Sequence, residues 1–206
     1  LEFRRVLFRS RPGDRHLARS RLGIPEAAFV VGIVATLRSW KGHRYLVDAV
    51  SRIQDAGVWL VMVGDGPGRP YLDEQCRSLG MNQVIMPGNQ RNVEEWLQAF
   101  DVFVLPSYAN EGVPQALMQA MACGLPVLTT PVGAIPEIVT DGSTGLMVTP
   151  RNADSLRDGI VRLRDDPGLR ERLSLAALER ARERFSMERM LDAMERIFAG
   201  VVPVHA

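Results

Sequence analysis

The sequence predicts an α/β domain built on a doubly wound parallel sheet of about six strands, with further helices at its carboxyl end. Short apolar segments recur through residues 30–148, as is typical of strands buried on both faces of a parallel sheet. Amphipathic helical segments separate these strands. Alternation of strands and helices at this spacing implies right-handed crossovers and ligand binding beyond the carboxyl ends of the strands.

The predicted strands are short runs rich in β-branched and large apolar residues. Runs of this length are shorter than most helices and match the length of buried strands. In chain order they are Val30–Ala35, Val58–Val63, Val84–Met86, Val102–Leu105, Val127–Thr129 and Leu146–Val148.

The predicted helices carry their apolar residues on one face; Leu117, Ala120 and Met121, for example, follow the i, i+3, i+4 spacing. Beyond residue 153 the helices are highly charged, with acidic and basic residues interspersed as on a solvated surface. In chain order the predicted helices are His43–Ala56, Tyr71–Leu79, Val93–Phe100, Gln115–Ala122, Ala153–Leu163, Leu169–Arg184 and Ser186–Ala199.

Residues 11–200 are expected to form one Rossmann-like domain, because a chain of 206 residues can bury one sizeable core. Residues 1–10 place three arginines among bulky apolar residues and lead into no periodic element. They resemble a translated linker rather than a signal peptide, and we expect them to be non-native or disordered. Residues 201–206 are expected to form a frayed tail.

The composition argues against several classes of function. The net charge of +1 gives no electrostatic reason to expect a nucleic acid partner. No apolar run approaches the ~20 residues that span a bilayer. The sequence contains no cysteine or histidine cluster with zinc spacing, no G-x-S-x-G elbow and no phosphate-binding G-x-x-x-x-G-K-[ST] motif. We therefore expect no metal.

The stretch EGVPQALMQAMACG, from Glu111 to Gly124, is chemically the most informative. Glu111 follows a predicted strand, Gly112 allows the backbone to approach a ligand closely, and Pro114 suits the first position of a helix that Gly124 ends. The amides and the dipole at a helix N-terminus attract an anion such as phosphate. A nearby carboxylate accepts hydrogen bonds from hydroxyl groups, so this combination suits a nucleotide sugar.

This stretch resembles the E-G-x-P-x-x-x-x-E-A-x-A-x-G signature of retaining glycosyltransferases of the GT-B fold, in particular those of family 4, also called group 1. The resemblance implies that Glu111 binds hydroxyls of the donor sugar and that Gly112, Val113 and Pro114 are donor-binding residues, with the amides of Gly112 and Val113 near the donor. Gln119 stands where the family has a second glutamate, which usually holds the ribose; its amide can accept a hydrogen bond but carries no charge. The matching residues are Glu111, Gly112, Pro114, Ala120, Ala122 and Gly124.

A second motif, ATLRSWKGH, follows the first predicted strand. The family often has G-R-L-x-x-x-K-G there, and its arginine and lysine hold the diphosphate of the donor. Lys41, the only lysine of the chain, and Gly42 match this motif, whereas Thr36 replaces the arginine. Arg38, two positions further on, either supplies the missing charge or lies in solvent. The resemblance thus implies Lys41, Arg38 and Glu111 as the catalytic residues.

Two more loops follow predicted strands. Gly64 begins G-D-G-P, where the family has G-x-G-P close to the nucleotide; an ordinary structural turn is the alternative. The loop from Met86 through Gly88 to Arg91 corresponds to the one whose backbone contacts the nucleobase in the family. Arg91 either stacks on the base or lies in solvent. Gly64, Met86, Gly88 and Arg91 complete the predicted donor-binding residues.

The resemblance covers the chain from about Arg21 to Phe198 and implies the C-terminal, donor-binding half of a GT-B enzyme. It implies transfer of a sugar from a UDP- or GDP-linked donor to a lipid or glycan acceptor, with retention of configuration and no cofactor. We expect an N-terminal Rossmann-like acceptor domain to be missing, the isolated chain to be inactive, and the enzyme to be cytoplasmic and peripheral at the inner membrane through the missing domain. The alternatives are a non-catalytic nucleotide-sugar-binding or interaction module and half of a sugar-nucleotide epimerase.

Overall fold

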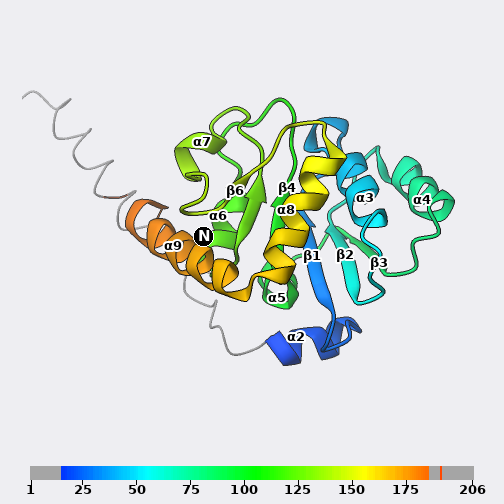
Figure 1. The fold of residues 1–206 in the computed structure, drawn as a ribbon. Helices are drawn as coiled ribbons and strands as arrows, with labels where there is room; N and C mark the ends of the chain where they lie inside the picture. The colour runs from blue at the N-terminus through cyan, green and yellow to red at the C-terminus, as the bar shows by residue number, and fades with distance from the viewer. Residues whose placement is uncertain (1–14, 186–190, 192–206) are drawn as a thin grey trace, which may run out of the picture.

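A single parallel sheet of six strands, in the order β3-β2-β1-β4-β5-β6, forms the centre of the molecule (Figure 1). The computed structural model describes residues 15–185 and Leu191. The order reverses between β1 and β4, which is the topological switch point of a doubly wound sheet. The predicted fold class is therefore confirmed. The strands are β1 (Phe29–Val34), β2 (Val58–Val63), β3 (Val84–Gly88), β4 (Val102–Leu105), β5 (Val127–Thr129) and β6 (Leu146–Met147).

Helices cover both faces of this sheet. The chain runs from β1 through β2 to β3 on one side of the sheet, and then returns past β1 to β4, β5 and β6 on the other side. Because the crossovers are right-handed, α3 and α4 lie on one face of the sheet and α5 and α6 lie on the other. Helix α8 packs against α3, and α9 packs against α6. These elements are α2 (Arg15–Leu22), η1 (a 3-10 turn, Ser39–Lys41), α3 (His43–Ser51), α4 (Arg69–Ser78), α5 (Val93–Ala99), α6 (Gln115–Ala122), α7 (Ile135–Ile138), α8 (Ala153–Asp165) and α9 (Pro167–Phe185).

The core is formed by the two faces of the sheet and the helix faces that cover them. Residues of the central strands β1 and β4, such as Val31 and Val104, are completely buried. Gly32 of β1 leaves the space that the Phe100 ring fills, since a Cβ atom at position 32 would lie 2.1 Å from that ring. A larger residue at position 32 would push β1 away from the segment that leads into β4.

The predicted helix over Gln115–Ala122 is confirmed residue by residue. It ends in a Schellman motif, in which Gly124 adopts a φ of 71° and the Leu125 N–H donates to the Ala120 carbonyl. The prediction for Pro114 was wrong by one position: it is the extended N-cap residue rather than the first helical residue.

Other boundaries differ more. Helix α3 ends at Ser51 rather than Ala56, because the following residues form tight turns in which the Asp55 carboxylate accepts the Gly57 N–H. Strand β3 extends to Gly88, so part of the predicted base-binding loop is strand. Three predictions lie outside the described residues: the segments 1–10 and 201–206, and the helix over Ser186–Ala199, of which only Leu191 is described.

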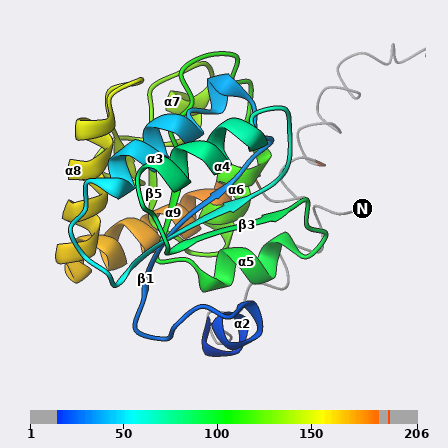
Figure 2. The ribbon, with the colours of Figure 1, turned by 90° about the vertical axis from the view of Figure 1, so that its right-hand side faces the viewer.

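Helix α2 was not predicted from the sequence. A buried ion pair between its Arg19 and Asp101 attaches it to the rest of the domain. Arg19 is fully buried, and its guanidinium donates to the carbonyls of Glu26, Ala28 and Ala99 and, at 2.6 Å, to the Asp101 carboxylate. The same carboxylate accepts the Val30 N–H of β1 at 2.6 Å. The charge pattern of α2 suits an exposed helix, so its docking below the sheet, beside α5, was not visible in the sequence (Figures 1 and 2).

We predict that Asp101→Ala lowers the free energy of unfolding by about 3–5 kcal/mol, because it leaves the buried Arg19 guanidinium without its counter-charge. Urea denaturation followed by circular dichroism measures this loss. The matched control is Arg21→Ala, which breaks the exposed pair with Glu95 and should cost about 1 kcal/mol or less. Equal losses in the two variants would contradict a structural role for the buried pair.

Candidate functional site

The loops that follow β1 and β4 meet at the switch point of the sheet, at the top of Figure 1. Gly42 allows this contact: its φ is 78°, and a Cβ atom there would lie 2.0 Å from the Pro106 carbonyl oxygen. The Tyr108 N–H donates to the Trp40 carbonyl at 2.9 Å and ties the two loops together. Residues far apart in the sequence are therefore held at one edge of the sheet.

This contact brings together two predicted site residues. The Lys41 ammonium donates to the Glu111 carboxylate, with Nζ 2.7 Å from Oε1. The Glu111 side chain is only 3% exposed, whereas that of Lys41 is 19% exposed and accessible from solvent. The Ser107 hydroxyl donates to the same carboxylate oxygen. A charge-assisted pair is thus already in place at the point where the sheet topology predicts a ligand.

The backbone of Glu111 is held from the other side by the turn that follows β5. Gly133 has a φ of 58°, and a Cβ atom there would lie 1.8 Å from the Glu111 carbonyl oxygen. The Ala134 N–H donates to that carbonyl, and the Thr130 hydroxyl donates to the Ser107 carbonyl. The sequence did not predict that Ser107 or Gly133 would support Glu111.

Helix α6 begins beside this pair. Its first internal hydrogen bond runs from the Leu117 N–H to the Pro114 carbonyl, so the preceding amides have no partner within the helix. Gly112 and Val113 are exposed, and a Cβ atom at position 112 would meet nothing within 4 Å. This end of α6 is therefore open to an anion, which the unpaired amides and the helix dipole favour. Gln119 is partly buried in the second turn of the helix.

The Arg38 side chain takes no part in the Lys41–Glu111 pair. It is exposed, and its guanidinium lies over the Trp40 ring, 5.4 Å from the ring centroid. The Arg38 backbone carbonyl accepts the Lys41 N–H at 3.1 Å, but its side chain forms no ion pair with Glu111. Its predicted role at the diphosphate remains a prediction.

The predicted residues near the base lie at the ends of β2 and β3. Gly64, with a φ of 134°, packs against the Ala35 carbonyl and donates its N–H to the Gly88 carbonyl at 2.9 Å. The Met86 side chain lines a surface hollow with residues of α4. Arg91 is exposed and forms no ion pair with the described residues. The close packing gives Gly64 a structural role, whereas the contacts of these residues with a nucleotide remain predictions.

Two further observations concern only the part of the chain that the structure describes. In it, no group of three or more histidine, cysteine, aspartate or glutamate side chains is placed to hold a metal ion. None of its helices is both long enough and apolar enough to cross a bilayer.

Comparison with known proteins identifies the family. Residues 14–180 match the family model of glycosyl transferases group 1. The chain is 33% identical to the D-inositol 3-phosphate glycosyltransferase of Kribbella flavida and 35% identical to the lipopolysaccharide core biosynthesis glycosyltransferase LpsD of Rhizobium meliloti. These alignments cover 82% and 92% of this chain but 43% and 54% of the relatives. The chain belongs to the group 1 glycosyltransferases and spans about half the length of these relatives.

Solved structures show the same fold. The Anabaena protein Alr3699/HepE, in complex with UDP and glucose, is 27% identical with a TM-score of 0.88, over 95% of this chain and 54% of its own. The C-terminal domain of the group 1 protein LpcC from Francisella tularensis is 24% identical with a TM-score of 0.76, over 85% of this chain and 94% of that domain. The described part of the chain therefore has the architecture of one half of a GT-B glycosyltransferase, as predicted.

We predict that Gly42→Ala destabilises the domain by about 1–3 kcal/mol, because the new Cβ atom would force the β1 and β4 loops apart. Thermal unfolding measures this loss. The matched control is Gly80→Ala: Gly80 also has a positive φ, 66°, but a Cβ atom there would meet nothing within 4 Å. The control should lose stability through the φ alone and therefore lose less; equal losses in the two variants would contradict the steric role of the Gly42 contact.

Proposed function

We propose that this chain is the donor-binding domain of a retaining glycosyltransferase that transfers a sugar from a nucleoside diphosphate sugar to an acceptor. The observation that carries the proposal is the Lys41–Glu111 pair beside the open N-terminus of α6. It combines groups suited to phosphate with a carboxylate suited to sugar hydroxyls. The complexes of the Anabaena relative with UDP and with UDP-glucose support the choice of donor class.

Stabilisation of the departing diphosphate is the main catalytic role that we assign to this domain. Lys41 and the free amides around Gly112 and Val113 would bind the phosphate oxygens as negative charge develops on the leaving group. Such groups act strongly because they are already oriented before the reaction. Arg38 would contribute only if its side chain turned away from Trp40, over which it now lies.

Glu111 orients the donor sugar in this proposal. In the free domain its carboxylate is neutralised by Lys41 and bound by Ser107, so its position is fixed before the donor arrives. When the diphosphate competes for the Lys41 ammonium, the Glu111 oxygen gains capacity to accept hydrogen bonds from sugar hydroxyls. The ion pair would thus be exchanged for two contacts with the donor. No nucleophile is proposed from this domain.

The nucleoside would lie along α6 and the end of β3. Gln119 faces the ribose in this arrangement, and the backbone from Met86 to Gly88 contacts the base. Gly64 lies next to the nucleotide, and Arg91 stacks on the base or remains in solvent. No metal is assigned a role, since Lys41 and the α6 amides provide positive charge where the leaving group departs.

The acceptor requires a second domain in this proposal. The matched relatives extend well beyond the segment that corresponds to this chain. We propose that a second Rossmann-like domain completes the cleft, holds a lipid or glycan acceptor, and positions the enzyme in the cytoplasm at the inner membrane.

We predict that Lys41→Met weakens binding of UDP by about tenfold or more but that of uridine very little, because a charge-assisted hydrogen bond to phosphate contributes ~1.5–3 kcal/mol. Methionine preserves the length of the side chain and removes the charge. Calorimetric titration with both ligands measures the difference. Arg21→Gln, which removes an exposed charge from α2 at the opposite end of the sheet (Figure 1), is the control and should leave both affinities unchanged.

Glu111→Gln separates the two halves of the proposed site. This variant should retain affinity for UDP, because Lys41 is then free for phosphate, but should lose the additional affinity that UDP-glucose or another accepted UDP-sugar has over UDP.

If Lys41→Met weakens the binding of uridine and of UDP equally, Lys41 does not contact the diphosphate. Failure of wild-type protein to bind any of a panel of nucleoside diphosphates and their sugars would overturn the proposed function itself.

We predict that Gln119→Glu strengthens UDP binding by about 1 kcal/mol, because a carboxylate offers the ribose two charged acceptors instead of one neutral carbonyl. Affinity for 2′-deoxy-UDP should rise much less. Gln119 lies one turn after the exposed Gln115, where a second Gln→Glu variant serves as the control for added negative charge on α6. Equal changes for both nucleotides would show that position 119 does not face the ribose.

A further inference from the structure

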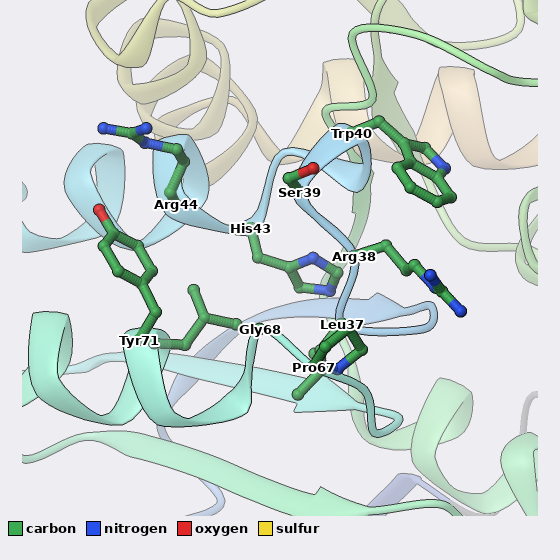
Figure 3. A pocket seen from close by; sticks show the side chains of 10 residues that line it. Leu37, Arg38, Ser39, Trp40, His43, Arg44, Pro67, Gly68 and Tyr71 are labelled. Carbon is green, nitrogen blue, oxygen red and sulfur yellow. The ribbon is translucent and has the colours of Figure 1, made fainter.

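The loop after β1 has a second side, which faces away from Glu111. On this side it contacts the loop after β2: the Leu37 N–H donates to the Asp65 carbonyl, and the Gly68 N–H donates to the Leu37 carbonyl. A pocket of about 440 Å³ lies above this contact, between the β1 loop, the start of α3 and the start of α4 (Figure 3). This volume is within the range of small-molecule sites. Its lining residues are Leu37, Arg38, Ser39, Trp40, His43, Arg44, Pro67, Gly68, Tyr71 and Leu72.

This pocket is separate from the proposed donor site. Lys41, Glu111 and Gln119 do not line it; of the predicted donor-site residues only Arg38, whose guanidinium lies over Trp40, does. It lies on the face of the sheet covered by α3 and α4, whereas the donor site opens toward α6. The single turn η1 contributes to both, with Trp40 in the pocket and Lys41 in the donor site.

The polar group at the centre of the pocket is His43, whose ring Figure 3 shows between Tyr71 and Arg38. His43 is 3% exposed, and neither Nδ1 nor Nε2 has a hydrogen-bond partner in the described part of the chain. Burial, with a smaller contribution from the charge of Lys41, lowers the pKa of His43 to about 4, although a contact with the Arg38 backbone, which does not have the geometry of a hydrogen bond, opposes this shift. The ring is therefore neutral at neutral pH, with one donor and one acceptor nitrogen.

An unpaired buried imidazole is costly, and buried polar groups without a partner are rare. A leucine or phenylalanine would fill the same space in α3 without this penalty. The arrangement is explained if a ligand in the pocket completes the hydrogen bonds of His43.

The rim of the pocket indicates the charge of that ligand. Arg38 lies over Trp40 on one side, and Arg44 lies 5.8 Å from the Tyr71 ring centroid on the other. A guanidinium stacked on a ring keeps its N–H edge available for hydrogen bonds. No aspartate or glutamate lines the pocket, and neither arginine forms an ion pair with the described residues. An anion would therefore find two unpaired positive charges.

We propose that this pocket is a second small-molecule site, separate from the donor site, for an organic anion with a flat aromatic or heteroaromatic body. The body lies over Leu37 and Pro67 between the two aromatic rings of the rim. The His43 ring forms a hydrogen bond with it, and Arg38 or Arg44 binds its carboxylate or phosphate. The assignment does not depend on the proposed glycosyl transfer.

The test uses NMR titration of the wild-type chain with indole-3-carboxylate and with phenyl phosphate, which separate carboxylate from phosphate binding. Indole and phenol are the uncharged controls. The imidazole signals of His43 and the indole N–H of Trp40 should shift in a saturable way, whereas the signals of Trp59 and Trp96 should not. The affinity for each uncharged control should be at least about tenfold lower than that for its charged counterpart. Shifts that exclude His43, or equal binding of charged and uncharged probes, would overturn the proposal.

Variants separate this site from the donor site. His43→Phe keeps a flat aromatic ring, slightly larger than imidazole, and removes both nitrogens; it should weaken binding of the anionic probe at least about tenfold while leaving UDP affinity unchanged. Lys41→Met should have the opposite pattern. Arg38→Gln and Arg44→Gln identify the cation that binds the anion, with the exposed Arg77→Gln as the control. Full probe binding by both arginine variants, or competition between probe and UDP, would overturn the assignment.

The stability of His43→Phe provides an independent measurement. Because the substitution removes two unpaired buried nitrogens, the variant should unfold at the same temperature as the wild type or higher in the absence of ligand. A large decrease would assign His43 a structural role and count against the site. If the variant fails to fold, the wild-type imidazole titration still decides the question.

Discussion

The contact between Gly42 and the Pro106 carbonyl brings the site of this domain together. Parallel strands β1 and β4 lie side by side, but the loops that follow them would diverge unless one backbone could approach the other closely. A residue without a Cβ atom and with a positive φ permits this approach. The same two strands are tied at their other end, where the Asp101 carboxylate accepts the Val30 N–H and pairs with Arg19. The central strand pair is thus fixed at both ends, and the carboxyl end is the one left open to a ligand.

The Lys41–Glu111 pair shows how a buried carboxylate is stabilised in the free domain. A glutamate that is 3% exposed would be costly without a counter-charge and a hydrogen-bond donor. Lys41 and Ser107 provide them in the free domain. Lys41 nevertheless remains partly exposed, so its ammonium is accessible from solvent. The ion pair therefore stabilises the free domain, and in the function proposed above the same lysine would be available to the diphosphate.

One loop serves two sides of the sheet. The segment from Leu37 to Lys41 contacts the β4 loop through the Trp40 carbonyl and the β2 loop through both backbone groups of Leu37. These hydrogen bonds hold the backbone of the loop in place, with Lys41 paired to Glu111 and His43 lining the pocket. This explains why the motif that supplies the proposed phosphate ligand also supplies the floor and rim of a separate pocket.

The sequence by itself determined the fold class, the six strands and helix α6, because apolar periodicity and strand–loop–helix spacing are local properties. It also determined that Lys41 and Glu111 lie at the same edge of the sheet, since each follows the carboxyl end of a strand. Boundaries that depend on turn chemistry, such as the end of α3 at Ser51, were less well predicted. Only the tertiary structure decided which side chains meet: Ser107 and Gly133 against Glu111, Arg19 against Asp101, and Arg38 over Trp40 instead of beside Lys41. Contacts between residues 70 or more positions apart, as in the 2.7 Å Lys41–Glu111 pair, depend on the strand order, and neither propensity nor periodicity encodes that order directly.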